Sequence, residues 1–215
     1  MRDIVIFGCG GHGREVLQIV LDQNVEGTRW RMLGFLVSEG IDAPPTVKGY
    51  PVFHDVEALG DPARLNLAIA IGNGRARKDV MNDLVRSGLT SFPSLVHPTA
   101  WIGRDVELGQ GVIVCAGALL TTDIALGDHT HVNIGATISH DCRIGAFSTL
   151  SPGVNLAGRV TLGEGVEVGT AASIIPGIKV GSWSVIGASA AVVQDIPEGC
   201  TAVGVPAKVI KHPLD

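Results

Sequence analysis

The sequence is poor in aromatic residues and in positive charge. Of its 215 residues only 4% are aromatic, and the 21 Asp and Glu outnumber the 16 Lys and Arg, for a formal net charge of −5. Nucleic acids and anionic membrane surfaces need a concentrated basic surface, so we expect neither as a partner. A chain with 29 glycines and few aromatics turns often and packs its interior with aliphatic side chains.

The chain also lacks paired cysteines and long apolar segments. Cys9, Cys115, Cys142 and Cys200 lie far apart and form no CxxC pair, and no signal peptide is recognisable, which together favour free thiols in the cytoplasm. The longest uncharged apolar run, residues 112–120, is too short to cross a bilayer. We therefore expect small-molecule ligands and no membrane association.

A six-residue repeat fills the second half of the chain. Every sixth residue from Val96 to Val192 is Ile, Leu or Val, without an insertion. A period of six fits neither a helix nor a sheet with turns every eight to twelve residues. It predicts a parallel β-helix with three short strands per eighteen-residue coil, about five coils in all. The seventeen positions are Val96, Ile102, Leu108, Val114, Leu120, Leu126, Val132, Ile138, Ile144, Leu150, Leu156, Leu162, Val168, Ile174, Val180, Ile186 and Val192.

The first ninety or so residues alternate between strand and helix patterns. Such alternation predicts a small Rossmann-like α/β domain with a parallel sheet. Pro93 and Pro98 mark the passage into the first coil, so we predict domains at residues 1–92 and 93–215. The predicted strands are 3–8, 32–37 and 67–71, and the predicted helices are 14–24 and 75–87.

The turn GCGGHG, residues 8–13, follows a predicted strand and opens a helix. Its glycines match the GxGxxG pattern, in which backbone N–H groups and the helix dipole favour a phosphate. About ninety residues cannot house the two halves of a dinucleotide-binding domain. A single nucleotide or a nucleotide-sugar is therefore the better ligand.

The two halves together resemble bacterial hexapeptide-repeat sugar acetyltransferases of the sialic-acid O-acetyltransferase type, a group that includes N-acetyltransferases for nucleotide-linked amino sugars. The resemblance runs through GCGGHGREV, AIGNGRARK, LVHPTAWIG, VNIGATISHDCRIG and VGVPAK. It implies a left-handed β-helix, acetyl-CoA as co-substrate, and a homotrimer with active sites between subunits. N-acetylation of a nucleotide-linked amino sugar is the leading hypothesis. O-acetylation of a sialic acid or another sugar hydroxyl, and a non-catalytic trimeric scaffold, are the alternatives.

The stretch ISHDCRIG, residues 138–145, holds the candidate catalytic pair. His140 is the candidate base, because histidine is the residue type whose ordinary pKa suits a base near neutral pH. The resemblance makes it the general base and makes Asp141 the acid that raises its basicity. Adjacent residues in a strand seldom point the same way, so we expect Asp141 to act through its field or a water. Arg159, one coil further, is a candidate partner for Asp141, and Gly158 is expected to leave open space beside the imidazole for the acceptor.

The resemblance also implies two sets of binding residues, with two departures from the family pattern. The second predicted strand ends in Val37 and Ser38 where the family commonly has an acidic pair, which leaves the nucleotide base open. Thr149 stands where the family often has a second histidine that touches the cofactor. The implied residues are Gly10, Gly11, His12, Gly13, Gly72 and Asn73 for the substrate, and Gly158, Thr170, Gly187, Ala188 and Lys208 for coenzyme A.

A zinc site is the rival interpretation within enzymes. His129, His131 and His140 are available, and the HTH stretch could present two nitrogens on one face of a strand. Their spacing does not match the closely placed ligand pair of β-helical carbonic anhydrases. A zinc site would also leave the N-terminal half unexplained, so we expect no metal.

Overall fold

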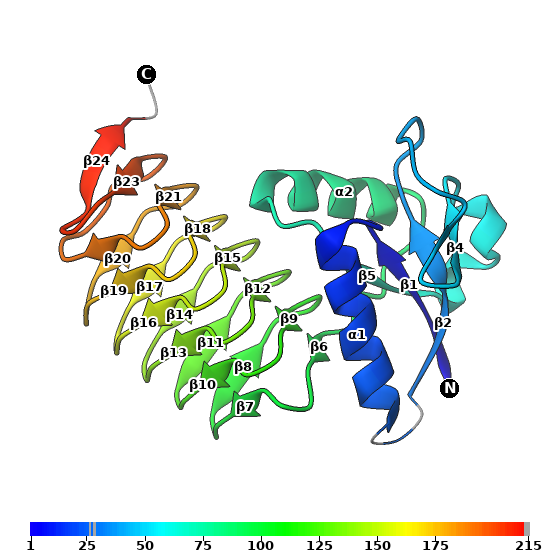
Figure 1. Cartoon of the computed structure of the whole chain (residues 1–215), viewed down its shortest axis with the longest axis horizontal. Coiled ribbons are helices and arrows are strands. Elements are labelled where there is room, and N and C mark those ends of the chain that lie inside the picture. The colour runs from blue at the N-terminus through cyan, green and yellow to red at the C-terminus, as the bar shows by residue number, and fades with distance from the viewer. Residues whose placement is uncertain (26, 28, 213–215) are drawn as a thin grey trace.

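A computed structural model of the chain describes residues 1–25, 27 and 29–212. An α/β unit built from the first ninety or so residues lies at one end of a long stack of short strands (Figure 1). No helix within the described residues has both the length and the apolar character that a bilayer crossing requires.

The N-terminal unit is a five-stranded sheet in the order β3-β4-β2-β1-β5. Strands β1, β2, β4 and β5 are parallel, and only β3 runs antiparallel to its neighbour. One apolar cluster joins the sheet to α1 and another joins it to α2, so the helices cover opposite faces. The short β3–β4 hairpin and the 3₁₀ turns that follow it were not predicted. The elements are β1 (Arg2–Phe7), α1 (Gly11–Val25), β2 (Trp30–Leu36), β3 (Thr46–Val47), β4 (Tyr50–Phe53), η1 (Glu57–Leu59), η2 (Pro62–Arg64), β5 (Asn66–Ile69) and α2 (Gly74–Arg86).

The rest of the chain is the predicted left-handed β-helix, with three flat faces. Successive strands step from one face to the next, and each pairs in parallel with the strands one coil away. Face 1 holds β6 (Leu95–Val96), β9 (Ile113–Val114), β12 (His131–Val132), β15 (Thr149–Leu150), β18 (Glu167–Val168), β21 (Val185–Ile186), β23 (Thr201–Val203) and the antiparallel β24 (Lys208–Lys211). Face 2 holds β7 (Trp101–Ile102), β10 (Leu119–Leu120), β13 (Thr137–Ile138), β16 (Asn155–Leu156), β19 (Ser173–Ile174) and β22 (Ala191–Val192). Face 3 holds β8 (Val106–Leu108), β11 (Ile124–Leu126), β14 (Arg143–Ile144), β17 (Thr161–Leu162) and β20 (Lys179–Val180).

The repeated aliphatics form the interior of this prism. From Val114 to Val192 each of them is at most 3% exposed. Val96, Ile102 and Leu108 are only half-buried, because the first coil has a neighbouring coil on one side only. The period of six is therefore the spacing of one inward residue per face, as predicted.

A second ladder runs along the corner between faces 3 and 1, at positions eighteen residues apart. His129 lies between Phe92 and Phe147, with its ring stacked on Phe147 at a centroid distance of 5.3 Å. One coil beyond Phe147 the position is Gly165, and the Trp183 ring covers it, within 2.1 Å of where a Cβ would lie. These residues give α2 an aromatic surface to pack on.

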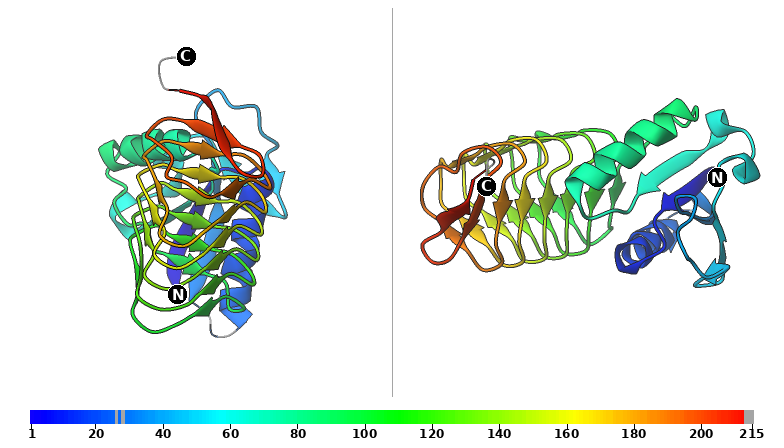
Figure 2. Two further views of the ribbon diagram at one scale, coloured as in Figure 1. Left: turned by 90° about the vertical axis from the view of Figure 1, so that its left-hand side faces the viewer. Right: turned by 90° about the horizontal axis from the view of Figure 1, so that it is seen from above.

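Both helices of the N-terminal unit contact the β-helix (Figure 2): α1 lies against face 1, and α2 lies along the corner between faces 3 and 1. From α2, Lys78 pairs with Glu164 at 2.6 Å, and Arg75 stacks over the Trp183 ring at 4.4 Å. From α1, Gln23 donates a hydrogen bond to the Val96 carbonyl at 2.8 Å. The domain boundary at residues 92 and 93 falls between α2 and β6 and stays a prediction.

Candidate active site

His140 and Asp141 lie on the corner between faces 2 and 3, in the turn that joins β13 to β14. The His140 carbonyl accepts a hydrogen bond from the Arg159 N–H at 2.9 Å, which ties this turn to the next coil. Asp141 has a φ of 62°, a left-handed conformation that Asp tolerates better than most residues. The corner is thus a fixed turn that presents two polar side chains to solvent, each about half exposed.

The two side chains contact each other directly, and the expectation that they would not was wrong. His140 Nδ1 lies 2.7 Å from Asp141 Oδ2. The rule that neighbouring side chains diverge holds for extended backbone, whereas the positive φ of Asp141 turns its carboxylate back toward the ring. Because a carboxylate only accepts, Nδ1 carries the hydrogen and Nε2 of the neutral ring keeps a free lone pair.

Gly158 lies beneath the imidazole. A Cβ on Gly158 would lie 2.7 Å from His140 Nε2 and 2.6 Å from its Cε1. The space left by the missing side chain is therefore filled by the imidazole itself, and the expectation that it stays open for the acceptor was wrong. Within the described chain no acceptor is found for the Gly158 N–H, so this donor is available beside the ring.

Arg159 does not take Asp141 away from His140. The ion pairs among the described residues include His140 with Asp141 but none between Asp141 and Arg159. Arg159 also has a positive φ, of 62°, and its side chain is exposed. Asp141 is therefore committed to the imidazole.

The glycine turn lies at the carboxyl end of β1, as its sequence pattern predicts. Gly8 has a φ of +99°, and a Cβ on Gly13 would lie 2.0 Å from the Gly8 carbonyl oxygen. Only glycine at residue 13 allows α1 to pack this closely on the strand. Gly10 and Gly11 have nothing within 4 Å of a would-be Cβ, so the first turn of α1 faces open space, as a phosphate site requires.

His12 connects this turn to the β-helix. Its Nε2 lies 3.2 Å from Nδ1 of the buried His131 on face 1, and its Nδ1 lies 3.0 Å from a Glu15 carboxylate oxygen. Burial and the nearby Arg77 charge hold the pKa of His131 well below its ordinary value. A pocket of about 390 Å³ opens beside these residues, between α1 and face 1, and is lined by His12, Glu15, Gly72, Asn133, Thr149, Ser151, Pro152, Glu167, Val168, Gly169, Val185 and Ile186.

Asn73 has intramolecular partners for both polar atoms of its side chain. Its Oδ1 caps α2 by accepting from the Ala76 N–H at 3.0 Å, and its Nδ2 donates to Glu167 at 2.7 Å. Gly72 is exposed, and its carbonyl accepts from the Thr149 hydroxyl at 2.8 Å. Thr149, in the place of the family's second histidine, therefore joins the two units.

Arg77 is an interface residue that was not predicted, because nothing in the sequence marks it as buried. It is 0% exposed, and its guanidinium donates to carbonyl groups of both units. Burial lowers its pKa to about 9, so it is still charged at neutral pH. The charged side chain fixes the N-terminal unit against coils two and three of the β-helix.

The residues implied for coenzyme A divide between two corners that flank face 2. Gly158 lies under His140, whereas Thr170, Gly187 and Ala188 lie on the corner between faces 1 and 2. There the Thr170 carbonyl accepts from the Ser189 N–H at 2.8 Å. Lys208 is exposed in β24, at the end of face 1. One copy of the chain does not bring these residues together.

The carboxyl end of β2, where the family's acidic pair is missing, opens on a second pocket. Val37 is buried and Ser38 exposed, and Glu39 and His54 lie on the rim. The pocket measures about 340 Å³ and has an apolar floor formed by Phe7, Leu36, Val37, Val56 and Leu84.

The three histidines of the zinc hypothesis are not neighbours. His129 stacks in the aromatic ladder, His131 lies under α1, and His140 lies on the corner opposite face 1. Within the described residues no group of three or more potential ligands could hold a metal ion.

The glycine turn and His140 face different directions. The N-terminal unit covers face 1, and the corner between faces 2 and 3 is the edge of the prism opposite face 1. The candidate catalytic pair and the glycine turn of one copy therefore lie on different sides of the β-helix.

Comparisons with known proteins place this architecture in a family. Residues 3–84 match the model of the PglD N-terminal domain. PerB from Caulobacter crescentus, solved with CoA and GDP-perosamine, is 34% identical, with 98% of each chain covered and a TM-score of 0.87. The acetyltransferase domain of PglB from Neisseria gonorrhoeae is 32% identical, covering 98% of this chain and 100% of that one, with a TM-score of 0.85. WeeI from Acinetobacter baumannii is 27% identical, with the same coverage and a TM-score of 0.86. No curated protein sequence matches.

The fold and the His-Asp corner define a β-helical acyltransferase. More narrowly, the chain belongs to the hexapeptide-repeat family of nucleotide-linked amino-sugar acetyltransferases.

Proposed function

We propose that this protein transfers the acetyl group of acetyl-CoA to the amino group of a nucleotide-linked amino sugar, with His140 as the general base. The observation that carries this is the 2.7 Å contact between His140 Nδ1 and Asp141. It orients the ring and leaves Nε2 free to accept a proton. The PerB relative, solved with CoA and GDP-perosamine, supports the choice of donor and acceptor class.

The chemistry follows from the atoms at this corner. The acceptor amine attacks the thioester carbonyl carbon while Nε2 of His140 takes one proton from the nitrogen. The Gly158 N–H, which lacks an acceptor within the described chain, is the candidate donor to the carbonyl oxygen as it becomes negative. Collapse of the tetrahedral intermediate breaks the C–S bond, and the CoA thiolate leaves with the proton that the His140 imidazolium returns. Asp141 stabilises the imidazolium that forms in between.

We propose a homotrimer in which the acceptor bound by one copy reacts at the His140 corner of a neighbouring copy, because the glycine turn and His140 of one copy lie on different sides of the β-helix. Trp101 and Leu119 point outward from face 2 and are 56% and 44% exposed. If face 2 is buried between subunits, the corner with His140 and Gly158 lies beside the next copy's corner with Thr170, Gly187 and Ala188. One groove then holds the cofactor and opens toward the neighbour's glycine turn.

The acceptor side consists of the glycine turn and the pocket beside it. The N–H groups of the first α1 turn, with Gly10, Gly11 and Gly13, suit the phosphates of a nucleotide-sugar. His12 and Gly72 line the pocket of about 390 Å³ that would receive the sugar. Asn73 serves indirectly, by capping α2. We keep the cytoplasm as the proposed location, because all four cysteines are free thiols.

The test is thiol release from acetyl-CoA with a panel of UDP-, dTDP- and GDP-linked amino sugars, and with free sialic acids. We expect turnover with at least one nucleotide-linked amino sugar and a product heavier by one acetyl group. Turnover with sialic acids alone would replace N-acetylation by O-acetylation, and no turnover with any acceptor would refute the proposal.

A further inference from the structure

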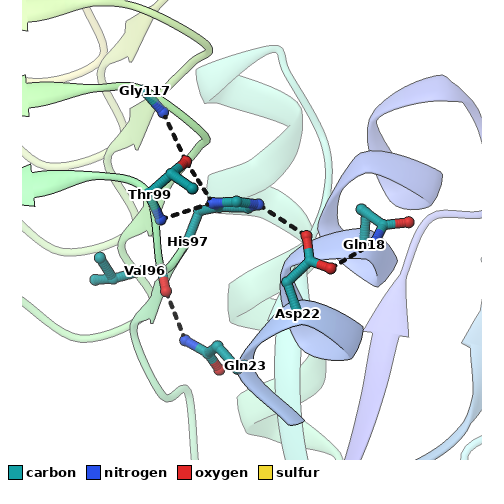
Figure 3. Close-up of polar contacts among 7 residues, drawn as sticks. All are labelled: Gln18, Asp22, Gln23, Val96, His97, Thr99 and Gly117. Carbon is teal, nitrogen blue, oxygen red and sulfur yellow. Dashed lines mark hydrogen bonds and ion pairs between the residues drawn. The ribbon is translucent and has the colours of Figure 1, made fainter. Parts of the chain in front are cut away.

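Helix α1 is joined to the first coil of the β-helix by an imidazole–carboxylate pair (Figure 3). His97 Nε2 lies 2.9 Å from Asp22 Oδ2, and Gln18 donates to the other Asp22 oxygen at 2.7 Å. The His97 side chain is only 12% exposed and that of Asp22 33%. A pair that is this well covered and joins two separate units holds its geometry better than a surface ion pair does.

The hydrogen bonds around His97 fix its tautomer. The Thr99 backbone N–H, which can only donate, lies 3.0 Å from His97 Nδ1, so Nδ1 accepts. The hydrogen of the neutral ring is therefore on Nε2 and points to Asp22. The Thr99 hydroxyl, 2.8 Å from Nδ1, donates to the same nitrogen and accepts in turn from the Gly117 N–H at 3.3 Å. The first two coils thus hold the ring from one side and α1 holds it from the other.

A second tie lies one residue further along the helix. The nearly buried Gln23 donates to the Val96 carbonyl at 2.8 Å and accepts from the indole N–H of Trp30 at 2.7 Å. At the opposite end of α1, His12 contacts His131 on face 1 at 3.2 Å. The helix is therefore attached to the β-helix at both ends, and the glycine turn is part of its N-terminal end.

We propose that Asp22 and His97 are positioning residues for the acceptor. The proposal rests on the proposed function, because it takes the glycine turn as the site of the nucleotide-sugar. Asp22 lies eleven residues from Gly11, a distance of about 16 Å at 1.5 Å per residue. A helix tilt of about 5° at the Asp22 end would move the turn by more than 1 Å, a displacement that costs up to about 100-fold when it misplaces a reacting group.

The coenzyme A candidates have no connection to this pair. Thr170, Gly187 and Ala188 lie on the same corner as His97 but about four or more coils further along, and Gly158 lies on the corner between faces 2 and 3; Asp22 and His97 contact none of them. Loss of the pair should therefore affect the acceptor and leave the donor unchanged. If the contact only stabilised the fold, its loss would lower the melting temperature without a selective effect on the acceptor kinetics.

The experiment compares Asp22→Ala, Asp22→Asn and a matched control, Asp3→Asn, which removes the charge from the exposed Asp3–Arg31 pair at the amino end of β1 in the same unit. We expect Asp22→Ala to lower kcat/KM for the acceptor about 10-fold with an unchanged KM for acetyl-CoA. Asp22→Asn, whose amide oxygen still accepts from Nε2, should stay within about 2-fold of wild type, and so should Asp3→Asn.

A double-mutant cycle with His97→Ala completes the test. If the two residues act as one unit, the double variant loses no more acceptor kcat/KM than Asp22→Ala alone. Wild-type acceptor kinetics in Asp22→Ala, or an equal rise of both KM values, would overturn the proposal. If Asp22→Ala does not fold, Gln23→Leu removes the neighbouring hydrogen bonds instead. It should likewise lower kcat/KM for the acceptor and leave the KM for acetyl-CoA unchanged. If the wild-type protein transfers no acetyl group, the proposed function is refuted. If the variants are active and their acceptor kinetics are unaltered, only the positioning role of Asp22 and His97 is refuted.

Discussion

Replacing Arg77 by Met should loosen the junction between the two units more than any exposed substitution would. The guanidinium donates to two oxygens of the N-terminal unit, Ile71 O at 2.5 Å and Gly72 O at 2.9 Å. It also donates to four oxygens of the β-helix, at 2.7 to 3.1 Å: His129 O, Phe147 O, Ser148 O and Thr149 Oγ1. No carboxylate contacts it within the described chain, so these oxygens, together with His131 Nδ1 at 3.4 Å from Nη1, replace its hydration.

The size of the effect follows from two opposing terms. Hydrogen bonds to a charged group contribute about 1.5–3 kcal/mol each, but burial of the charge, seen in the pKa of about 9, offsets much of the sum. Arg77→Met leaves six oxygens without this donor, and an unsatisfied buried group costs about 1–3 kcal/mol; because Gly72 O and Ser148 O keep other donors, we expect a net loss of about 3–5 kcal/mol. At about 2–4 °C per kcal/mol for a chain of this size, the melting temperature should fall by about 6–20 °C.

The assay is differential scanning calorimetry of Arg77→Met beside Arg75→Met, the same substitution two residues away. Arg75 is exposed and only stacks on Trp183, so its loss should cost no more than about 1 kcal/mol. Arg77→Met should also split the transition into two, as the units separate. A melting temperature within about 2 °C of wild type would refute the claim that this buried charge joins the units.

Three further predictions concern stability, the catalytic corner and assembly. Burial lowers the pKa of His129 to about 4, below its unfolded value near 6.5, so the unfolded chain takes up the proton first as pH falls. Urea titrations should show that this residue makes the free energy of unfolding about 2 kcal/mol lower at pH 5 than at pH 7. His129→Asn should reduce this difference, and an equal pH dependence of stability in wild type and variant would contradict the prediction. Gly158→Ala should displace the imidazole and lower kcat about 100-fold or more in a folded protein. A fully active variant would show that the active imidazole does not lie against residue 158. Leu119→Glu, on the outer surface of β10 in face 2, should yield monomers in sedimentation without acetyl transfer, whereas an active monomer would rule out a shared site.

The repeat and the glycine turn could be predicted because each is local in sequence. One inward aliphatic per face repeats without interruption, so stacking follows from spacing alone. The contact between His140 and Asp141 could not be predicted by a rule for extended strands, because it depends on a positive φ at the corner. That conformation recurs at Asp105, Asp123 and Arg159, at intervals of eighteen residues. The positive φ of Asp141 could therefore have been predicted from its position in the eighteen-residue coil.

The interface between the units was harder to anticipate. Arg77 lies on the same helix as the exposed Arg75 and Arg86, and nothing local distinguishes a buried arginine from a solvated one. Its environment comes from the β-helix turns near residues 129 and 147–149, more than fifty residues away. The ladder of His129, Phe147 and Trp183 follows the same eighteen-residue spacing as the core, and could have been found by reading the corner positions as a repeat.

The measurement that tests the central claim most directly is the pH dependence of kcat/KM for the acceptor in wild type and in His140→Asn. We expect the wild-type rate to rise as a histidine loses its proton. We also expect a variant slower by about 10²–10⁴-fold that has lost this limb while its KM for acetyl-CoA is unchanged. A His140→Asn protein with wild-type rates and the same pH profile would show that the base is another group.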